Sequence, residues 1–256
     1  MSTVVQTAQA LGLMSALTLS VLSLPAAAAF PPPDWTFQGT FGTAGADGVV
    51  TAPPGGGDYL YVVSNGATTG LGLGLGEEQN GSLARWSFSA MVGDRLEFAF
   101  NYVTTDGGDF TDYAWARLLD GGTNPVAMLF NARTAVSGDT VPGNGLPAID
   151  SAFQLTPASA AIMPDATEWS PLGGWSGTCF AVGCGYTGWV AMSYTFTTAG
   201  SYVLEVGVVN WSDGNHDSGL AFAGNLVPVP EPQTYAMMLA GLGLLAWAAR
   251  RRRDRV

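Results

Sequence analysis

The feature that most constrains the fold is the alternation of apolar and polar residues, with a period of two, which recurs in short segments of the chain. It is clearest at 94–103 (DRLEFAFNYV), where the apolar positions are Leu96, Phe98, Phe100 and Tyr102. Such alternation places one set of side chains on one face of a β-strand. We expect these four to face a core while the polar residues between them face outwards: Arg95, Glu97 and Asn101.

Similar runs without a helical period predict further strands at about 35–41, 58–63, 83–90, 113–119, 126–133, 188–197, 201–210 and 219–227. Glycine and proline punctuate the segment 137–187, which we interpret as an irregular insertion with at most one or two short strands. No convincing helix precedes the C-terminal tail. The pattern predicts an all-β body, an antiparallel, jelly-roll-like β-sandwich at 30–227.

Charge narrows the classes of partner. The chain has no lysine, and residues 30–230 hold four arginines against 18 acids, a formal charge of −14. Such a body repels nucleic acid and anionic lipid and is free to bind cations. We therefore expect no nucleic-acid partner.

The first 29 residues are typical of a signal peptide. An apolar segment at 10–24 precedes a small-residue stretch, and cleavage after Ala28 or Ala29 would start the mature protein near Phe30. This predicts a helical signal segment, export by the Sec machinery and cleavage by signal peptidase. The segment departs from the usual pattern in that its first ten residues contain no Arg or Lys. A permanent N-terminal anchor is the alternative, which the alanine-rich cleavage site disfavours.

The tail at 228–256 has three parts in a fixed order. A proline-bracketed acid, Val229-Pro230-Glu231-Pro232, comes first and should be extended and open to a protease. An apolar run at about 235–249 follows, which we predict to be a single transmembrane helix, although its roughly 22 Å is short for a bilayer core of roughly 30 Å. The basic end should stay in the cytoplasm: Arg250, Arg251, Arg252, Arg253 and Arg255.

This tail resembles the PEP-CTERM sorting signal of Gram-negative bacteria that make exopolysaccharide. The resemblance implies recognition by an exosortase, a membrane protease or transpeptidase, with cleavage near Pro230-Glu231-Pro232. An ordinary tail anchor with a coincidental proline turn is the alternative. Four stretches of the body, YVVSNGATTGLGLG, FNYVTTDGGDFTDYAWARL, GTCFAVGCGYTGW and NWSDGNHDSGLAF, also look like an exported PEP-CTERM family of unassigned function.

Two cysteines, Cys179 and Cys184, lie close together in a glycine-rich stretch of a chain that we expect to be exported. A local disulfide is the natural interpretation. A zinc site is disfavoured, because the chain holds one histidine and no second cysteine pair.

Two acidic loops could supply oxygen ligands to calcium, which takes six to eight. The first holds Asp106, Asp109 and Asp112, and the second holds Asp213, Asn215 and Asp217. The second is not an EF-hand, because it lacks glycine at position six and has Gly224 instead of glutamate at position twelve. Asx turns and strand caps are the structural alternative for each loop, and we expect no other cofactor.

Each of the remaining candidate catalytic or binding residues has an ordinary structural explanation as the alternative. His216 has no Gly-x-Ser-x-Gly partner motif and should be solvated. Glu97 and Glu205 could form a glycosidase pair, but solvated strand-face acids are more common. Trp175 and Trp211 could stack on sugar rings, or could simply be buried beneath loops.

We therefore expect a non-catalytic exported protein, anchored transiently in the membrane and then sorted to the cell envelope, outer surface or exopolysaccharide matrix, with a structural or adhesive role. A carbohydrate-binding module, with or without calcium, is the alternative. A glycoside hydrolase or lyase comes third.

Overall fold

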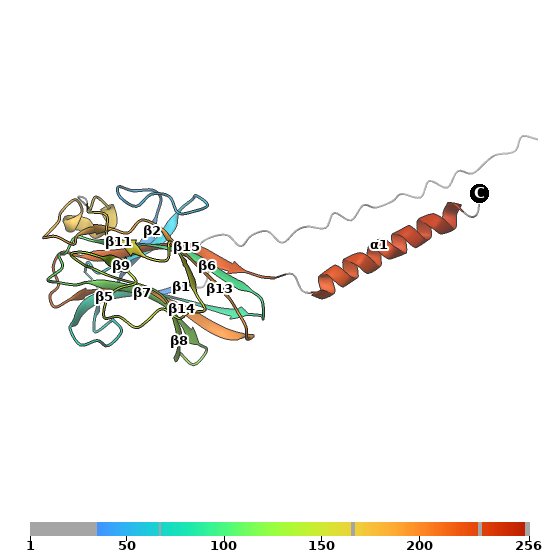
Figure 1. Ribbon diagram of the computed structural model, residues 1–256, viewed down its shortest axis with the longest axis horizontal. Helices are drawn as coiled ribbons and strands as arrows, with labels where there is room; N and C mark the ends of the chain where they lie inside the picture. Colours follow the sequence, from blue (N-terminus) through green and yellow to red (C-terminus); the bar gives the residue numbers. More distant parts are fainter. Residues whose placement is uncertain (1–34, 67, 165–166, 230–231, 254–256) are drawn as a thin grey trace, which may run out of the picture.

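The computed structural model describes residues 35–66, 68–164, 167–229 and 232–253. Figure 1 shows two layers of strands, with the C-terminal helix α1 (Pro232–Arg253) outside them. The predicted signal segment 1–29, including Ala28 and Ala29, lies outside the described residues.

The first layer, sheet A, has the strand order β1-β5-β14-β7-β8, with β4 paired to β5. Every pairing is antiparallel. Its strands are β1 (Trp35–Gln38), β4 (Thr68–Thr69), β5 (Glu78–Ala90), β7 (Tyr113–Asp120), β8 (Pro125–Arg133) and β14 (Gly200–Trp211).

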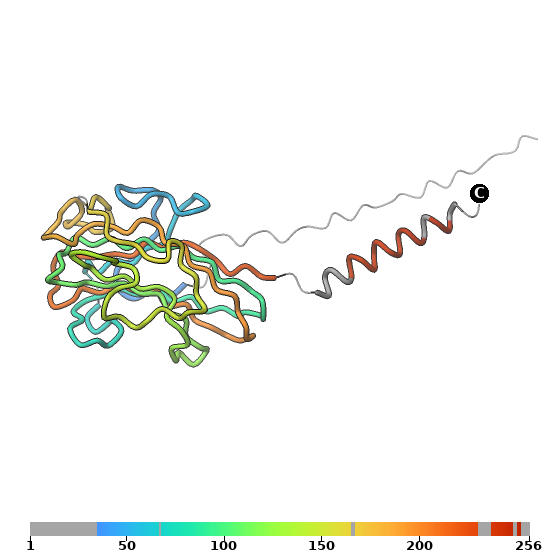
Figure 2. Tube along the Cα trace, viewed as in Figure 1, coloured from blue at the N-terminus to red at the C-terminus, as the bar shows by residue number. Residues whose placement is uncertain are grey.

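The second layer, sheet B, has the order β10-β13-β6-β15-β3-β2, with β12 paired to β6, and is also antiparallel. Its strands are β2 (Thr40–Ala44), β3 (Tyr59–Val63), β6 (Arg95–Thr104), β10 (Gln154–Thr156), β12 (Gly185–Tyr186), β13 (Val190–Thr195) and β15 (Ser218–Val227). The chain crosses between the layers from β5 to β6, β6 to β7, β13 to β14 and β14 to β15, as Figure 2 lets the reader follow. The predicted antiparallel sandwich is confirmed.

Alternating side chains of both sheets fill the space between the layers. The four apolar residues of β6 that were predicted to face inwards are all buried in this core, and Phe100 stacks on Phe130 of the opposite sheet with ring centroids 4.8 Å apart. The predicted strand at 35–41 divides at Gly39, whose φ of 83° suits glycine. The break lets β1 join sheet A while β2 joins sheet B.

One part of the outer face of sheet B is covered, which corrects one prediction. Asn101 was expected to face solvent, yet it is only 1% exposed. A second apolar cluster lies on this face and includes Val103 of β6 and Trp169. The Trp169 ring packs so closely over Gly219 that a Cβ there would collide with it, so glycine is needed to let the insertion lie flat on the sheet.

The insertion at 137–187 is more ordered than predicted. It contains four short strands rather than one or two, β9 (Asp139–Val141), β10, β11 (Ala160–Ala161) and β12, and a 3₁₀ helix, η1 (Ser170–Trp175). β9 and β11 pair with each other, whereas β10 and β12 extend sheet B. Strands of two or three residues are too short to show a periodic pattern, so the sequence carried no signal for them.

Candidate functional site

The sorting segment begins where the sandwich ends. β15 stops at Val227, and the backbone N–H of Val229 donates to Asp94 Oδ1 at 3.0 Å. Pro230 and Glu231 lie outside the described residues. Pro232 was predicted to be extended, but it is the first residue of α1, a position that proline tolerates because its missing N–H is not needed there.

The rest of the tail is a helix with a basic end. Arg250, Arg251, Arg252 and Arg253 all lie in the last turn and a half of α1, and Arg255 follows outside the described residues. The Arg251 guanidinium lies over the Trp247 ring, 5.0 Å from its centroid.

Among the residues described, no helix has the length and apolar character needed to cross a membrane. The transmembrane helix predicted at about 235–249 is therefore not confirmed. An apolar run of about 15 residues is short for this purpose.

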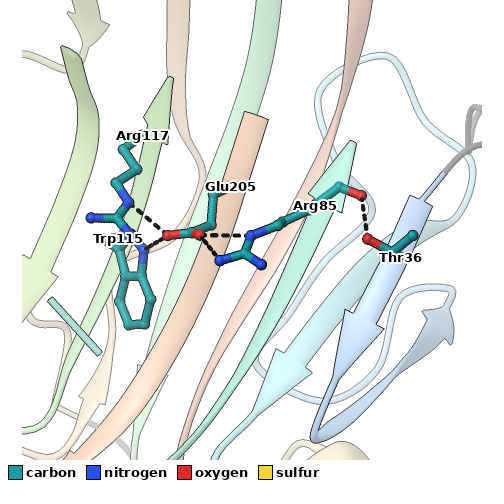
Figure 3. A network of polar contacts seen from close by, with 5 residues as sticks. All are labelled: Thr36, Arg85, Trp115, Arg117 and Glu205. Carbon is teal, nitrogen blue, oxygen red and sulfur yellow. Dashed lines mark hydrogen bonds and ion pairs between the residues drawn. The ribbon is translucent and has the colours of Figure 1, made fainter. Parts of the chain in front are cut away.

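Glu205 lies on the outer face of sheet A and is fully buried. Figure 3 shows why: its carboxylate lies between two arginines from the neighbouring strands. Arg85 Nε donates to Oε2 at 2.8 Å, Arg117 Nε donates to Oε1 at 2.6 Å, and Trp115 Nε1 donates to Oε1 at 3.1 Å. Burial alone would raise the pKa of Glu205, but these hydrogen bonds and charges outweigh it and lower the pKa.

The imagined glycosidase pair is not formed. Glu205 belongs to β14 in sheet A, whereas Glu97 belongs to β6 in sheet B. Glu97 forms a solvent-exposed ion pair with Arg95 at 2.8 Å. Glu205 was predicted to point outwards, which is correct, but it is not solvated, because the arginines and Trp115 cover it.

The two acidic loops do not stay separate. Asp106 and Asp112 of the first loop and Asp217 of the second are all buried, and we call these three the aspartate cluster. Asp112 accepts hydrogen bonds from Ser218 Oγ at 2.7 Å and from the Trp211 N–H at 2.8 Å. Asp217 Oδ1 accepts from Ser64 Oγ and Asn210 Nδ2, both at 3.1 Å.

Burial dominates the electrostatics of the aspartate cluster. It raises the pKa of Asp106 to about 7, and the nearby Asp213 carboxylate adds to that rise. Burial also raises the pKa of Asp112 well above its usual range, and the charges of Asp106 and Asp217 act in the same direction. Burial is also the main cause that raises the pKa of Asp217.

The other predicted calcium ligands lie at the surface. Asp109 and Asn215 are exposed and Asp213 is partly exposed. Asp213 Oδ1 accepts the Asn215 N–H at 2.9 Å, as expected for an Asx turn. In the described parts of the chain, no three His, Cys, Asp or Glu side chains gather closely enough to hold a metal ion, and calcium binding stays a prediction.

The predicted disulfide between Cys179 and Cys184 is present, with Cα atoms 5.7 Å apart. The loop it closes is tied to the chain after β6, because the Phe180 N–H donates to Thr105 O at 2.9 Å. Within this small loop, Phe180 is 50% exposed and Val182 is 72% exposed. The sequence reasoning missed both, although an apolar residue between two bridged cysteines was a usable signal.

Phe180 belongs to a file of ring side chains that we call the aromatic row: Phe110, Phe180, His216 and Trp175. The ring centroids are 5.7 Å apart from Phe110 to Phe180, 4.9 Å from Phe180 to His216 and 4.3 Å from His216 to Trp175. His216 is thus held between two aromatic rings instead of being freely solvated, and Trp175 is only partly buried.

Trp211, the second predicted stacking residue, does not join the aromatic row. It packs against Tyr113 of β7, with ring centroids 6.0 Å apart, and the Arg133 guanidinium covers its ring at 4.5 Å. Its polar neighbours therefore already occupy the face that a sugar would use.

A groove of about 450 Å³ crosses the outer face of sheet B. Its floor consists of small residues, and hydrogen-bonding side chains line it: Asp58, Glu97, Gln154, Thr156, Ser193 and Asn225. A second hollow, of about 500 Å³, lies beside Arg117 and the loop at 147–151. Neither hollow could be predicted from the sequence, because the lining residues come from distant segments.

Residues 228–253 match the family model of the PEP-CTERM protein-sorting motif. The match covers the tail alone, so the resemblance of the body to a particular exported family is not confirmed. No curated protein matches the chain. A solved exo-β-agarase structure is similar over 78% of this chain and 24% of its own, so this chain spans about a quarter of it, with 12% identity and a TM-score of 0.28. The chain carries a PEP-CTERM sorting motif, and it is on that ground an exported protein sorted by an exosortase to the cell envelope or surface.

Proposed function

We propose that the sandwich is a non-catalytic module that works in the cell envelope or in the exopolysaccharide matrix, in a structural or adhesive role. The sorting motif at 228–253 is the observation that carries this proposal, since it gives the body an extracytoplasmic destination. A body charge of −14 suits a place outside the membrane, because it is repelled by anionic lipid.

The arrangement of the acids supports a non-catalytic role. A general acid or nucleophile must reach its substrate, yet Glu205 is buried and already bound by Arg85, Arg117 and Trp115. The acids of the aspartate cluster are buried as well. Glu97 and Asp58 line the sheet B groove and Asp150 lines the second hollow, so an enzyme hypothesis that uses either hollow would rest on these carboxylates.

Deletion of 229–256 tests the destination. We expect the deleted protein to fold and to be exported, but to lose tail processing and to be released into the medium instead of remaining with the envelope or matrix. Immunoblots of membrane, outer-surface and medium fractions measure this. Unchanged processing and location would contradict the proposal.

A point variant makes the test sharper. Glu231→Ala alters the sorting motif, and Glu168→Ala removes an exposed acid from the body as the matched control. We expect Glu231→Ala to impair processing and Glu168→Ala to leave it unchanged. For the non-catalytic role, we expect the purified protein to release no sugar from polysaccharide. A cleaving activity that the double variant Asp58→Asn/Glu97→Gln abolishes would point to an enzyme.

A further inference from the structure

The loop between Cys179 and Cys184 presents apolar side chains to solvent in a fixed position. The disulfide closes it, the Phe180 N–H bonds to Thr105 O, and the Gly108 N–H bonds to Val182 O at 3.0 Å. Soluble surfaces rarely expose large apolar groups together without a use. A loop that is already rigid loses little conformational entropy when it binds a partner.

The aromatic row extends this surface in one direction. Phe180 contacts Phe110 on one side and His216 on the other, and Trp175 follows His216. His216 has a φ of 53°, and its Nδ1 has no hydrogen-bond partner among the described residues. Phe180 is exposed and the other three rings are half-buried. Successive rings are edge-on or tilted to one another, and the unpaired His216 nitrogen is buried among them.

The rim of the aromatic row is acidic and polar. Asp109 lies in the same loop as Phe110, and Asp213 and Asn215 lie just before His216. These side chains accept hydrogen bonds from hydroxyl groups, and Asn215 also donates. Three arginines of the described body are bound to acids away from the row, Arg85 and Arg117 to Glu205 and Arg95 to Glu97, and Arg133 is bound to Thr111 beside Phe110. The rim therefore repels an anionic ligand.

We propose that the aromatic row and its rim bind an uncharged polysaccharide. The apolar faces of sugar rings would pack on Phe180 and Trp175, while sugar hydroxyls would donate to Asp213 and Asp109. This inference rests on the proposed adhesive role and names its partner.

A protein partner fits the same surface less well. A stable protein interface buries about 800 Å² on each side and about 20–30 residues. Here the exposed apolar side chains of the disulfide loop are Phe180 and Val182, and Asp109, Asp213 and Asn215 lie within three residues of ring residues in the chain. A sugar chain needs only a strip of rings with hydrogen-bonding groups at its edge.

The position of the row suits a ligand outside the cell. β15 starts at Ser218, beside Thr104 and close to the row, and ends at Val227, beside Arg95 and the start of the tail. The 10 residues of the strand separate the two ends by roughly 30 Å. In Figure 1 the loops around η1 lie at the left of the sandwich, whereas β15 leads towards the tail at the right.

Native gel electrophoresis of the full chain in detergent, with soluble polysaccharide cast into the gel, tests the inference. The probes are three neutral polymers, mixed-linkage β-glucan, xyloglucan and galactomannan, and one anionic polymer, alginate. We expect at least one neutral polymer to slow the protein and alginate not to. Phe180→Ala should weaken that binding about tenfold or more.

Phe41→Ala is the matched control, because Phe41 is 47% exposed but lies in β2, away from the row. The Phe41→Ala variant should bind as the unaltered protein does. Phe41→Ala and Phe180→Ala should both have the melting temperature of the unaltered protein. Cys179→Ser/Cys184→Ser frees the loop and should weaken binding by a smaller factor.

Several results would overturn the inference. One is that no neutral polymer slows the protein, and another is that Phe180→Ala binds normally. Loss of binding in Asp58→Asn/Glu97→Gln but not in Phe180→Ala would move the site to the sheet B groove. Self-association that Phe180→Asp abolishes, without polysaccharide binding, would identify a protein partner. These are measurements on purified protein, so their failure leaves the cellular test of location untouched.

Discussion

Glu205 and the aspartate cluster are both carboxylates removed from water, but among the described residues only Glu205 is paired with arginines. Arg85 and Arg117 lie directly opposite Glu205 on the two strands that flank β14, and the pKa of Glu205 is lowered. Asp106, Asp112 and Asp217 are surrounded by hydroxyls, amides and one another, and their pKa values are raised. The same loss of solvation therefore has opposite results, decided by the partners that the strand register supplies.

The opposite pKa shifts of Glu205 and the aspartate cluster also make their contributions to the free energy of unfolding depend on pH in opposite directions. Because the pKa of Glu205 is lowered in the folded state, Glu205 contributes stability at pH values above the ordinary pKa of glutamate. This contribution is lost as the pH falls through the folded-state pKa of Glu205. Because the pKa values of the aspartate cluster are raised, these groups contribute stability at pH values below the ordinary pKa of aspartate. This contribution is lost as the pH rises through each folded-state pKa, which is about 7 for Asp106. We therefore expect the free energy of unfolding to be greatest in mild acid, at about pH 4–5.

The largest effect is expected from Arg117→Met, which removes one cation from beside Glu205. Breaking a buried ion pair leaves a charge without its partner, so the free energy of unfolding at pH 7 should fall by about 3 kcal/mol. Urea titration measures this change. Adding Glu205→Gln to the same variant should restore part of the loss, and a loss below about 1 kcal/mol would mean that Arg85 and Trp115 suffice.

Asp106→Asn should have an intermediate effect of the opposite sign. Asparagine resembles the protonated acid, so the variant should gain about 1–2 kcal/mol at pH 8 and nothing at pH 4. Unfolding in EGTA across this pH range measures it.

Asp109→Asn, in the same loop but exposed, is the control and should change stability at neither pH. A pH profile that Asp106→Asn leaves unaltered would remove Asp106 from the comparison. A rise in melting temperature with calcium but not with magnesium would confirm the calcium prediction.

The smallest effect is expected from Arg95→Met. The ion pair between Arg95 and Glu97, at 2.8 Å, is nearly as short as those of Glu205, but both side chains are about half exposed to solvent. Exposed pairs contribute about 0–1 kcal/mol, so we expect a loss of at most about 0.5 kcal/mol that vanishes in high salt. A loss equal to that of Arg117→Met would show that burial is not the deciding variable.

Local pattern predicted the strands well and their surroundings poorly. The alternation at 94–103 identified the inward face of β6 correctly. It also predicted that Asn101 would be solvated, which was wrong because Trp169, nearly 70 residues along the chain, belongs to a cluster that covers that face. A period of two gives the face of a strand but not what lies on it.

The site residues show the same limit. Cys179 and Cys184 were paired correctly because they are close in sequence. The pairing of Glu205 with Arg85 and Arg117 could not be predicted from the sequence, because it depends on β14 lying between β5 and β7 in sheet A. The aspartates were interpreted as two separate loops, whereas the start of β15 brings Asp217 close to Asp112.

β15 also decides how the protein would respond to tension. It pairs with β6 along all ten of its residues and with β3 along four. If the tail is held in the membrane and the distal loops hold a polymer, the pull acts parallel to this strand. Hydrogen bonds to both neighbours then carry the load together in shear and must break almost at once, so the sandwich is built to resist rupture in the direction in which a tether is stretched.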